Sequence, residues 1–303
     1  MDRLVIVTKE TRLEELVRQH MTEGAARFVL ESRGQSIDAY RQEDAAYRAA
    51  LVDLRRQIPG DLPTATVDRN RLPNFLFRDN DVIVVCGPDG LFVNTAKYVR
   101  DQPIICINPD PRTIAGVLMR FSPGMLGGLI ASIRAGEHMT ERLPFIKATI
   151  DDDRTLWGVN DVFIGRKDQI SARYALSFEG DEEHQSSSGI IVATGVGSTG
   201  WMHAVRTMIQ GVTGGRPHKL SHPPSPTEDE LEFIVREPFP SPTTGIEIIT
   251  GRITPEEPLT VVSEMPNGGY IFSDGVVEKA LEWKAGSTVE ISVGERYVQR
   301  IVR

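Results

Sequence analysis

The sequence predicts an α/β amino-terminal domain with a parallel sheet, followed by a β-rich carboxyl-terminal domain. In the first half, apolar runs alternate with segments of helical composition, which is typical of parallel α/β domains. From about residue 145 the apolar runs become short and are separated by glycine and proline turns, which indicates an all-β arrangement. We therefore expect one domain over residues 1–144 and a second over residues 145–303.

The elements of the first domain alternate along the chain. Its strands are apolar runs, and its longest helical segment is rich in alanine, arginine, glutamate and leucine. The expected strands cover residues 4–8, 82–86 and 104–108. The expected helices are one from Thr11 onward and two over residues 35–56 and 94–100.

The second domain has several short strand patterns and one helix. The expected strands cover residues 190–194, 245–250, 259–263 and 289–293. The helix is expected over residues 201–210. Residues 211–230 are crowded with Gly, Pro, Ser and His, a composition that predicts a long mobile loop near the functional site.

Composition narrows the class of protein. The chain has 303 residues and a formal net charge of −8, which argues against nucleic acid or an anionic membrane as its main partner. No apolar run is long enough to span a bilayer, and no secretory segment is evident. The two cysteines, Cys86 and Cys106, lie in predicted buried strands and are typical of a reducing compartment. A soluble cytoplasmic protein is expected.

The segment Asp81–Phe92 carries the most chemical information. Five apolar residues run into Gly87-Pro-Asp-Gly90, which predicts a strand buried on both faces and ending in a tight turn. Such turns at the carboxyl ends of strands bind ligands in open α/β sheets, and glycines allow backbone N–H groups to approach phosphates. The carboxylate of Asp89 suggests chemistry on a hydroxyl beside those phosphates. An ordinary surface turn is the alternative interpretation.

A literal G-x-G-x-x-G covers Gly195–Gly200 and follows the strand that ends at Thr194. It is the fingerprint of NAD-dependent dehydrogenases, but the second parallel strand and the acidic residue that the fingerprint requires are missing. What remains is a small-residue loop whose Ser198 and Thr199 hydroxyls suit a nucleotide, with the Trp201 indole available for stacking. A plain helix N-cap explains part of the same pattern.

Weaker candidates surround these two segments. Asn160 and Asp161 precede an apolar run and suit ribose hydroxyls or a carboxamide, although such pairs are more often turns. Asn108 ends another predicted strand and adds a polar rim beside Asp89 if the two strands are neighbours. The remaining candidates have little supporting context; they are Lys9 and Arg12 for phosphates, Asp151–Asp153 for a metal, and the loop histidines His218 and His222.

Taken together, the motifs resemble those of the NAD kinases, which share their fold with diacylglycerol and sphingosine kinases. Gly87-Pro-Asp-Gly90 is similar to the family's GGDG motif, Asn160-Asp161 to its Asn-Glu pair, and Gly197–Trp201 to its Gly-Ser-Thr-Ala-Tyr segment. The likeness is closest to the mitochondrial-type branch. It rests on Val7–Arg12, Asn108–Pro111, Asn160–Gly165, Ser187–Gly189 and Val235–Pro238, and a late Ser273-Asp-Gly275 fits the family's Asp-Gly near the carboxyl terminus.

The resemblance implies phosphorylation of the adenosine-ribose 2′-hydroxyl of NAD by ATP and Mg²⁺, with the site between the two domains and no protein-borne metal site. Asp89 would meet the acceptor hydroxyl, and Gly87 and Gly90 would shape the phosphate loop. The implied NAD-binding residues are Asn160, Asp161, Thr194, Gly197, Ser198, Thr199, Gly200 and Trp201, with Asn108, Ser188, Lys9 and Arg12 as further candidates. Family members commonly form homo-oligomers, so a homodimer or larger assembly is expected.

The sequence also departs from the family pattern. Pro88 replaces the second glycine of GGDG, which removes one N–H and fixes φ near −65°. Leu91 stands where the family usually has threonine. A diverged member that binds a nucleotide without making NADP is therefore the alternative function, because function resides in the site and not in the fold.

Overall fold

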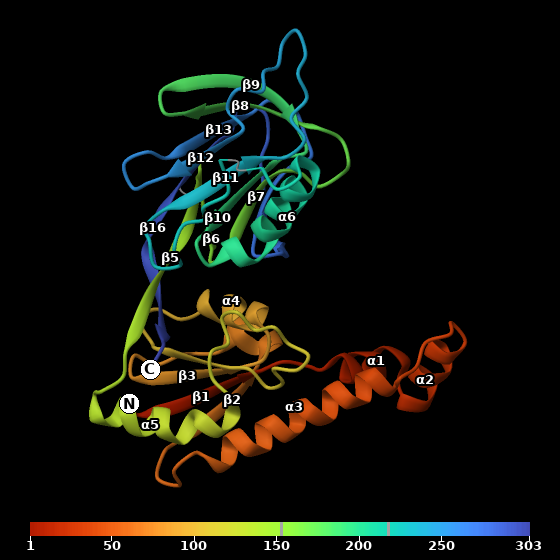
Figure 1. Ribbon diagram of the computed structural model, residues 1–303, viewed down its shortest axis with the longest axis vertical. Helices are drawn as coiled ribbons and strands as arrows, with labels where there is room; N and C mark the ends of the chain where they lie inside the picture. The colour runs from red at the N-terminus through yellow and green to blue at the C-terminus, as the bar shows by residue number, and fades with distance from the viewer. Residues whose placement is uncertain (152–153, 217–218) are drawn as a thin grey trace. The chain divides into compact units, whose positions relative to one another are not determined.

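The computed structural model describes residues 1–151, 154–216 and 219–303, and the chain divides into two compact units (Figure 1). The first unit comprises Met1–Glu141 with Gln299–Arg303, and the second comprises Arg142–Val298. The chain thus leaves the first unit within one strand, β5 (Thr140–Ile150), and returns to it within another, β16 (Thr288–Ile301). None of the helices in the described ranges is both long enough and apolar enough to cross a bilayer.

The first unit is built on a parallel sheet in the order β2–β1–β3–β4, with the end of β16 beside β4. The strands are β1 (Arg3–Thr8), β2 (Thr64–Asp68), β3 (Asp81–Cys86), β4 (Ile104–Ile107) and β16 (Thr288–Ile301). Every residue of β3 and β4 is buried, as the apolar runs predicted. The parallel α/β prediction for this part of the chain is confirmed.

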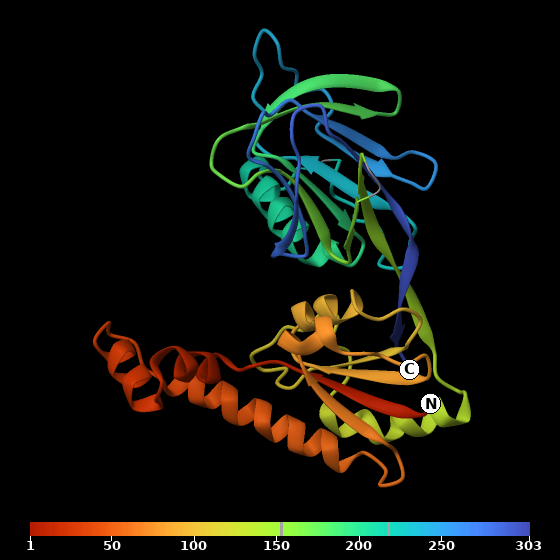
Figure 2. The ribbon, with the colours of Figure 1, turned by 180° about the vertical axis from the view of Figure 1, so that it is seen from behind.

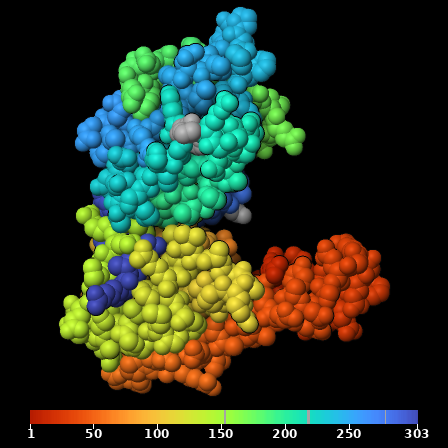
Figure 3. All heavy atoms as spheres, in the orientation of Figure 1, coloured from red at the N-terminus to blue at the C-terminus, as the bar shows by residue number. Residues whose placement is uncertain are grey.

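Helices cover both faces of this sheet (Figures 1 and 2). On one face α3 and α5 pack against alternate strand residues such as Leu4, Val84 and Ile105, whereas α4 lies on the other face. The helices α1 and α2 stand beyond the sheet, next to the start of α3 (Figure 3). The helical segments are α1 (Arg12–His20), α2 (Glu23–Glu31), α3 (Asp38–Arg56), α4 (Asp89–Ala96) and α5 (Leu126–Ala135), with short 3₁₀ helices η1 (Arg69–Asn74) and η2 (Pro123–Met125).

Local sequence explains where these helices begin. Thr11 and Glu14 form a capping box at the start of α1, so the helix predicted from Thr11 onward is confirmed. The prediction of a helix over residues 94–100 placed it too late, because α4 starts at Asp89, directly after Pro88. Proline and an acidic residue suit the first positions of a helix. The Gly87–Gly90 turn is therefore the amino-terminal end of α4.

The second unit is a sandwich of two largely antiparallel sheets. One sheet holds part of β16 with β5 (Thr140–Ile150), β6 (Arg154–Gly158), β8 (Ala172–Phe178), β9 (Asp181–Ser187) and β13 (Leu259–Ser263). The other has the order β12–β11–β10–β7–β14–β15. Its strands are β7 (Asp161–Arg166), β10 (Ile190–Thr194), β11 (Leu231–Val235), β12 (Thr250–Ile253), β14 (Gly269–Ser273) and β15 (Val276–Glu282).

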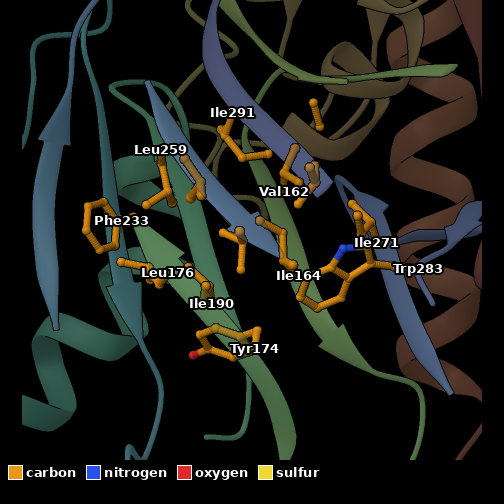
Figure 4. Packing of buried hydrophobic residues seen from close by; sticks show 14 of the residues in the cluster. Val162, Ile164, Tyr174, Leu176, Ile190, Phe233, Leu259, Ile271, Trp283 and Ile291 are labelled. Carbon is orange, nitrogen blue, oxygen red and sulfur yellow. The ribbon is translucent and has the colours of Figure 1, made fainter. Parts of the chain in front are cut away.

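The core of the second unit lies between its two sheets (Figure 4). Inward-facing residues of both sheets meet there, among them Ile164, Leu176 and Trp283. The outer face of the β7–β10–β11 region is covered by α6 (Trp201–Thr213), which follows the 3₁₀ helix η3 (Gly197–Thr199) and packs Met202 and Val205 on that face. The β-rich prediction is confirmed.

One predicted strand of this unit is wrong. Residues 245–249 form no strand, and β12 begins only at Thr250. The cause is the carboxylate of Glu183 on β9, which accepts the backbone N–H groups of Glu247 and Ile248 at 2.9 and 3.1 Å. A side chain therefore binds the donors that a sheet partner would otherwise use. The predicted loop over residues 211–230 includes residues 217–218, which lie outside the described ranges, and its first residues belong to α6.

A partly buried ion pair joins two neighbouring strands of the parallel sheet, β1 and β3. Arg3 on β1 donates to both carboxylate oxygens of Asp81 on β3, at 2.9 and 2.5 Å, and Asp81 is buried. Burial alone would raise the pKa of Asp81. The hydrogen bonds from Arg3 and from the Arg78 N–H, together with the charge of Arg3, outweigh burial and hold the pKa below its usual value.

Replacing Asp81 by Asn should therefore lower stability in a pH-dependent manner. A carboxyl with a lowered folded-state pKa stabilises the fold above its unfolded pKa and loses that contribution as the pH falls through the folded value. We expect Asp81→Asn to lower the unfolding free energy by about 1–3 kcal/mol at pH 7, with a smaller difference at pH 3, in denaturant titrations. The exposed pair of Asp61 and Arg134 supplies the control, Asp61→Asn, which should change little. An equal loss at both pH values would contradict this account.

Candidate functional site

The carboxylate of Asp89 lies at the carboxyl end of β3, in the first turn of α4. Its Oδ2 accepts the N–H of Val117 and its Oδ1 accepts the N–H of Leu118, both at 3.0 Å. The side chain is only partly buried. Asp89 is therefore held in one orientation by the loop that follows β4, while each oxygen keeps lone pairs that can accept further hydrogen bonds.

The turn before Asp89 uses ordinary backbone angles. Pro88 has φ −78° and ψ 167°, which proline adopts readily, and neither Gly87 nor Gly90 has a positive φ. The Gly87 N–H donates to the carbonyl of Ile107 on β4 at 3.1 Å. The proline that departs from GGDG is thus compatible with this turn, in which it is the residue directly before α4.

Asn108 lies beside this turn because β3 and β4 are neighbours, as the sequence suggested. Its Nδ2 donates to the Ile114 carbonyl at 3.0 Å, and its Oδ1 accepts the Asp110 N–H at 3.1 Å. Gly116 has φ +56°, and a Cβ there would lie 2.4 Å from the Asn108 Nδ2. Asn108 and Asp89 therefore hold the same loop, a link that the sequence did not reveal.

A hollow of about 1280 Å³ opens at the carboxyl ends of β1 and β2. At its wall the Tyr47 hydroxyl donates to the Cys86 carbonyl at 3.0 Å and accepts the Lys9 N–H at 3.1 Å. Burial raises the pKa of Tyr47. The hollow is lined by Thr8, Lys9, Glu10, Glu14, Arg18, Tyr47, Arg48, Leu51, Thr66, Val67, Asp68, Asn70, Arg71, Asn74 and Phe75. Both signs of charge are represented there, with Arg71 among the cations.

The two basic candidates after β1 share one carboxylate. Lys9 Nζ lies 3.7 Å from Glu43, and Arg12 Nε lies 2.5 Å from it. The Arg12 guanidinium also lies over the Tyr40 ring, 4.9 Å from its centroid. Lys9 lines the hollow, whereas Arg12 does not.

In the second unit, a carboxylate organises the Asn160 turn. Asp274 accepts the N–H groups of Val159, Asn160 and Asp161 at 2.7–3.2 Å. Asp274 itself has φ +52° and is followed by Gly275 at φ +68°. The Asp-Gly pair has no role that is evident from sequence, because its partners lie more than a hundred residues earlier.

The glycines of G-x-G-x-x-G serve close contacts between backbones. A Cβ on Gly197 would lie 1.8 Å from the Asn160 carbonyl oxygen, and one on Gly195 would lie 2.1 Å from that of Ser225. The preceding strand, β10, pairs antiparallel with both β7 and β11. The motif is therefore no dinucleotide fingerprint of the βαβ type, which agrees with our rejection of the dehydrogenase interpretation.

Thr194, Asn160 and the η3 turn form one hydrogen-bonded cluster. The Thr194 hydroxyl donates to the Val159 carbonyl at 2.7 Å and accepts the Gly197 N–H at 3.0 Å. The Thr199 hydroxyl donates to the Val196 carbonyl at 3.1 Å. The Asn160 Oδ1 is buried and finds no hydrogen-bond donor in the described part of the chain. An unpartnered buried acceptor is costly unless a ligand supplies the donor.

The remaining candidates of this unit lie around the cluster. Trp201 begins α6, and its ring stacks on Phe163 at 5.7 Å and on Phe272 at 6.4 Å, with Arg236 over it at 5.5 Å. Gly200 directly precedes α6. Ser188 lies in the turn before β10, at the end of that strand opposite to Thr194. The Trp201 ring, which the sequence offered for stacking on a nucleotide, thus already contacts aromatic and arginine side chains of its own unit.

Comparisons with known proteins agree on one family. No family model matches the chain. The NAD kinases of Saccharolobus islandicus and Saccharolobus solfataricus are 23% identical to it over 133 and 132 residues, which is 44% and 43% of this chain and 51% of each relative. The chain thus spans about half the length of the curated relatives it matches. The likeness to the mitochondrial-type branch stays a prediction.

Solved structures extend the likeness over the whole chain. An NAD kinase from Archaeoglobus fulgidus in complex with ATP has a TM-score of 0.57 and 19% identity, covering 99% of this chain and 93% of that one. Yeast NADH kinase complexed with NADH has a TM-score of 0.61 and 12% identity, covering 99% and 83%. The resemblance to the NAD kinases is therefore confirmed, and theirs is the fold of this chain.

Proposed function

We propose that the chain is an NAD kinase, which transfers the γ-phosphoryl group of ATP to the adenosine-ribose 2′-hydroxyl of NAD. The observation that carries the proposal is the Asp89 carboxylate, held by two backbone N–H groups at the carboxyl edge of a parallel sheet. Ligands bind at this edge in open α/β folds. The names of the relatives and of the structural neighbours, which are NAD and NADH kinases, support the same reaction.

Asp89 would orient the acceptor hydroxyl and take its proton. The hydroxyl oxygen forms a bond to the γ-phosphorus while the bond from that phosphorus to the ADP oxygen breaks, and the hydroxyl proton passes to the carboxylate. Phosphoryl transfer depends mainly on positioning and on charge neutralisation. The Asp89 oxygens are already positioned by Val117 and Leu118, so little reordering is needed when the hydroxyl arrives.

The hollow beside β1 and β2 is our candidate site for the triphosphate donor. Its volume of about 1280 Å³ suffices for a nucleotide, and its lining includes the cations Lys9 and Arg71. Magnesium would enter with the triphosphate, as part of the substrate, and would supply charge neutralisation. The ATP in the Archaeoglobus neighbour supports a nucleotide of this class.

The Asn160 turn and the η3 segment are our candidate site for the dinucleotide. The buried Asn160 Oδ1 requires an N–H donor, and the adenine amino group and the nicotinamide carboxamide of NAD both offer one. Asp161 follows Asn160 in sequence, the Thr194 N–H donates to the Asn160 carbonyl at 3.0 Å, and Ser198 follows Gly197, whose backbone lies against that carbonyl. The NADH in the yeast neighbour supports a reduced or oxidised dinucleotide as acceptor.

Two broader expectations belong to the same proposal. A homo-oligomer rests on the resemblance to the NAD kinases. A cytoplasmic location rests on two free, buried cysteines, which are compatible with a reducing compartment.

The direct test incubates the purified full chain with NAD, ATP and Mg²⁺ and follows NADP by a coupled enzymatic assay. NADP formation that requires all three supports the proposal. Tight NAD binding without NADP would instead identify a diverged nucleotide-binding protein. Parallel reactions with NADH and with polyphosphate define the acceptor and the donor.

Asp89→Asn should lower the rate of NADP formation by about 10²–10⁴-fold, since a positioned base contributes about that factor. Calorimetry should show NAD binding close to that of the wild type, because the candidate dinucleotide residues around Asn160 belong to the second unit. Asp101→Asn, at an exposed loop position, is the control and should keep full activity. Wild-type turnover in Asp89→Asn would refute the assigned role.

Asn160→Ala should raise the KM for NAD about tenfold, the effect of losing one hydrogen bond to the ligand. The KM for ATP should stay unchanged in steady-state assays that vary each substrate in turn. Asn80→Ala, which removes an exposed amide that donates to Asp2 at 2.9 Å, is the matched control. An unchanged KM for NAD would remove Asn160 from the dinucleotide site.

Arg71→Ala should weaken the use of ATP and not that of NAD, which is the reverse of the effect expected for Asn160→Ala. Removing one cation from the hollow should raise the KM for ATP about five- to tenfold and leave that for NAD unchanged, since a charge-assisted contact contributes about 1–1.5 kcal/mol. Arg27→Ala, which removes an arginine from the exposed face of α2, is the control. If NAD were affected and ATP were not, the hollow would not be the donor site.

A further inference from the structure

One arginine of α6 joins three separate segments of the second unit. Arg206 donates through Nη1 to the Ser198 carbonyl at 2.9 Å and through Nε to the Leu220 carbonyl at 2.8 Å. Its Nη2 binds the carboxylate of Glu232. The guanidinium therefore connects the η3 turn, the loop after α6 and strand β11.

The partner carboxylate is unusually placed. Glu232 is completely buried on β11, where it lies opposite Ala193 on the sheet face that α6 covers. Met202 and Val205 of α6 pack on that same face. A carboxylate in such apolar surroundings requires a charged partner, and the Arg206 guanidinium binds it directly. The pair therefore fixes the direction of the guanidinium.

The hydrogen bond from Arg206 to the Ser198 carbonyl links this arginine to the candidate dinucleotide site. Ser198 lies in η3, one residue after Gly197, whose backbone is pressed against Asn160. A hydrogen bond from a charged donor is short, directional and stronger than one between neutral groups. Through this bond, Arg206 determines where the peptide after Gly197 lies relative to the Asn160 turn.

We propose that Arg206, oriented by Glu232, is a positioning residue for the Gly195–Gly200 loop and thereby for dinucleotide binding. The proposal rests on the proposed function, in which this loop binds NAD. Neither residue belongs to the motifs that resemble the NAD kinases, so this role comes from the geometry of this chain. Arg206 acts through the backbone of Ser198 and need not touch the substrate.

The experiment must separate positioning from stability. Removing one partner leaves the other buried and unpaired, so the single variants are expected to lose stability. A buried ion pair replaced by apolar residues of similar volume often keeps its stability. The informative variant is therefore the double replacement Arg206→Met with Glu232→Leu, which should melt close to the wild type but leave the Ser198 carbonyl without its donor.

Arg252→Met is the matched control. Arg252 lies beside Glu232 on the neighbouring strand β12 and binds the His222 carbonyl in the same long loop, but it makes no hydrogen bond to Ser198. Arg252→Met therefore shows the effect of losing an arginine contact to this loop while the contact to Ser198 is kept. Both variants are compared with the wild type by thermal melting, by steady-state kinetics and by amide hydrogen exchange of residues 195–201.

For the double variant we expect faster exchange of residues 195–201 and a KM for NAD about tenfold higher, corresponding to one lost hydrogen bond. The kcat and the KM for ATP should stay near the wild-type values. Arg252→Met should change neither the exchange nor the KM for NAD. Wild-type exchange in the double variant, or the same effects in Arg252→Met, would overturn the proposal.

Hydrogen exchange also keeps this inference distinct from the proposed function. If the wild type made no NADP, the kinase proposal would fail, and faster exchange confined to residues 195–201 would still support the positioning role. If NADP formed normally and the double variant had an unchanged KM for NAD, the positioning role would fail and the kinase proposal would stand.

Discussion

The second unit depends on one close approach between backbones, in which the chain at Gly197 lies against the carbonyl of Asn160. No side chain fits between them, since a Cβ on Gly197 would stand 1.8 Å from that oxygen. The Thr194 hydroxyl joins the same two segments, because it donates to the Val159 carbonyl and accepts the Gly197 N–H. Asp274 accepts the N–H groups of the Asn160 turn. This contact sets the position of the candidate dinucleotide residues.

In the first unit, too, a carboxylate fixes the backbone of a distant loop. There the Asp89 carboxylate binds two amides of the loop after β4, as Asp274 binds three amides after β6. In each unit a carboxylate on one segment holds the backbone of another that is distant in sequence. Hydrogen bonds from backbone N–H groups to a carboxylate are strong because the acceptor is charged, so they help to fix the conformation of the loop. In both units, an acidic side chain thus orders a loop by accepting its backbone N–H groups.

The sequence was sufficient where the signal was local. The apolar run into Gly87 predicted β3 and its parallel partners, because burial on both faces leaves a continuous pattern. The helix expected from Thr11 onward is α1, and the structure shows that Thr11 caps it. The α/β character of the first part and the β-rich character of the second followed from the alternation and spacing of elements, and the motif order indicated the family resemblance. Sequence patterns predicted neither the strand order nor β2 (Thr64–Asp68).

What the sequence could not supply were contacts between distant segments. The amides of Val117 and Leu118 have no signature in sequence, so their hold on Asp89 was invisible. Glu183 removed the donors of an apolar run that otherwise fits a strand. Glu232 alternates with the core residues Leu231 and Phe233, so strand alternation predicts an exposed side chain there, whereas the structure buries it against Arg206. Each case involves a polar side chain whose partner is selected by the tertiary fold.

The Tyr47 hydroxyl has a consequence for how ligands reach the parallel sheet. It uses both its donor and its acceptor to join the ends of β1 and β3, through Lys9 and Cys86. The Lys9 N–H and the Cys86 carbonyl at this junction therefore already have a partner within the chain. The Tyr47 side chain on α3 thus joins two neighbouring strands, and a ligand in the hollow beside it would be recognised mainly by side chains. The turn at Asp89 has its own, separate hydrogen bonds.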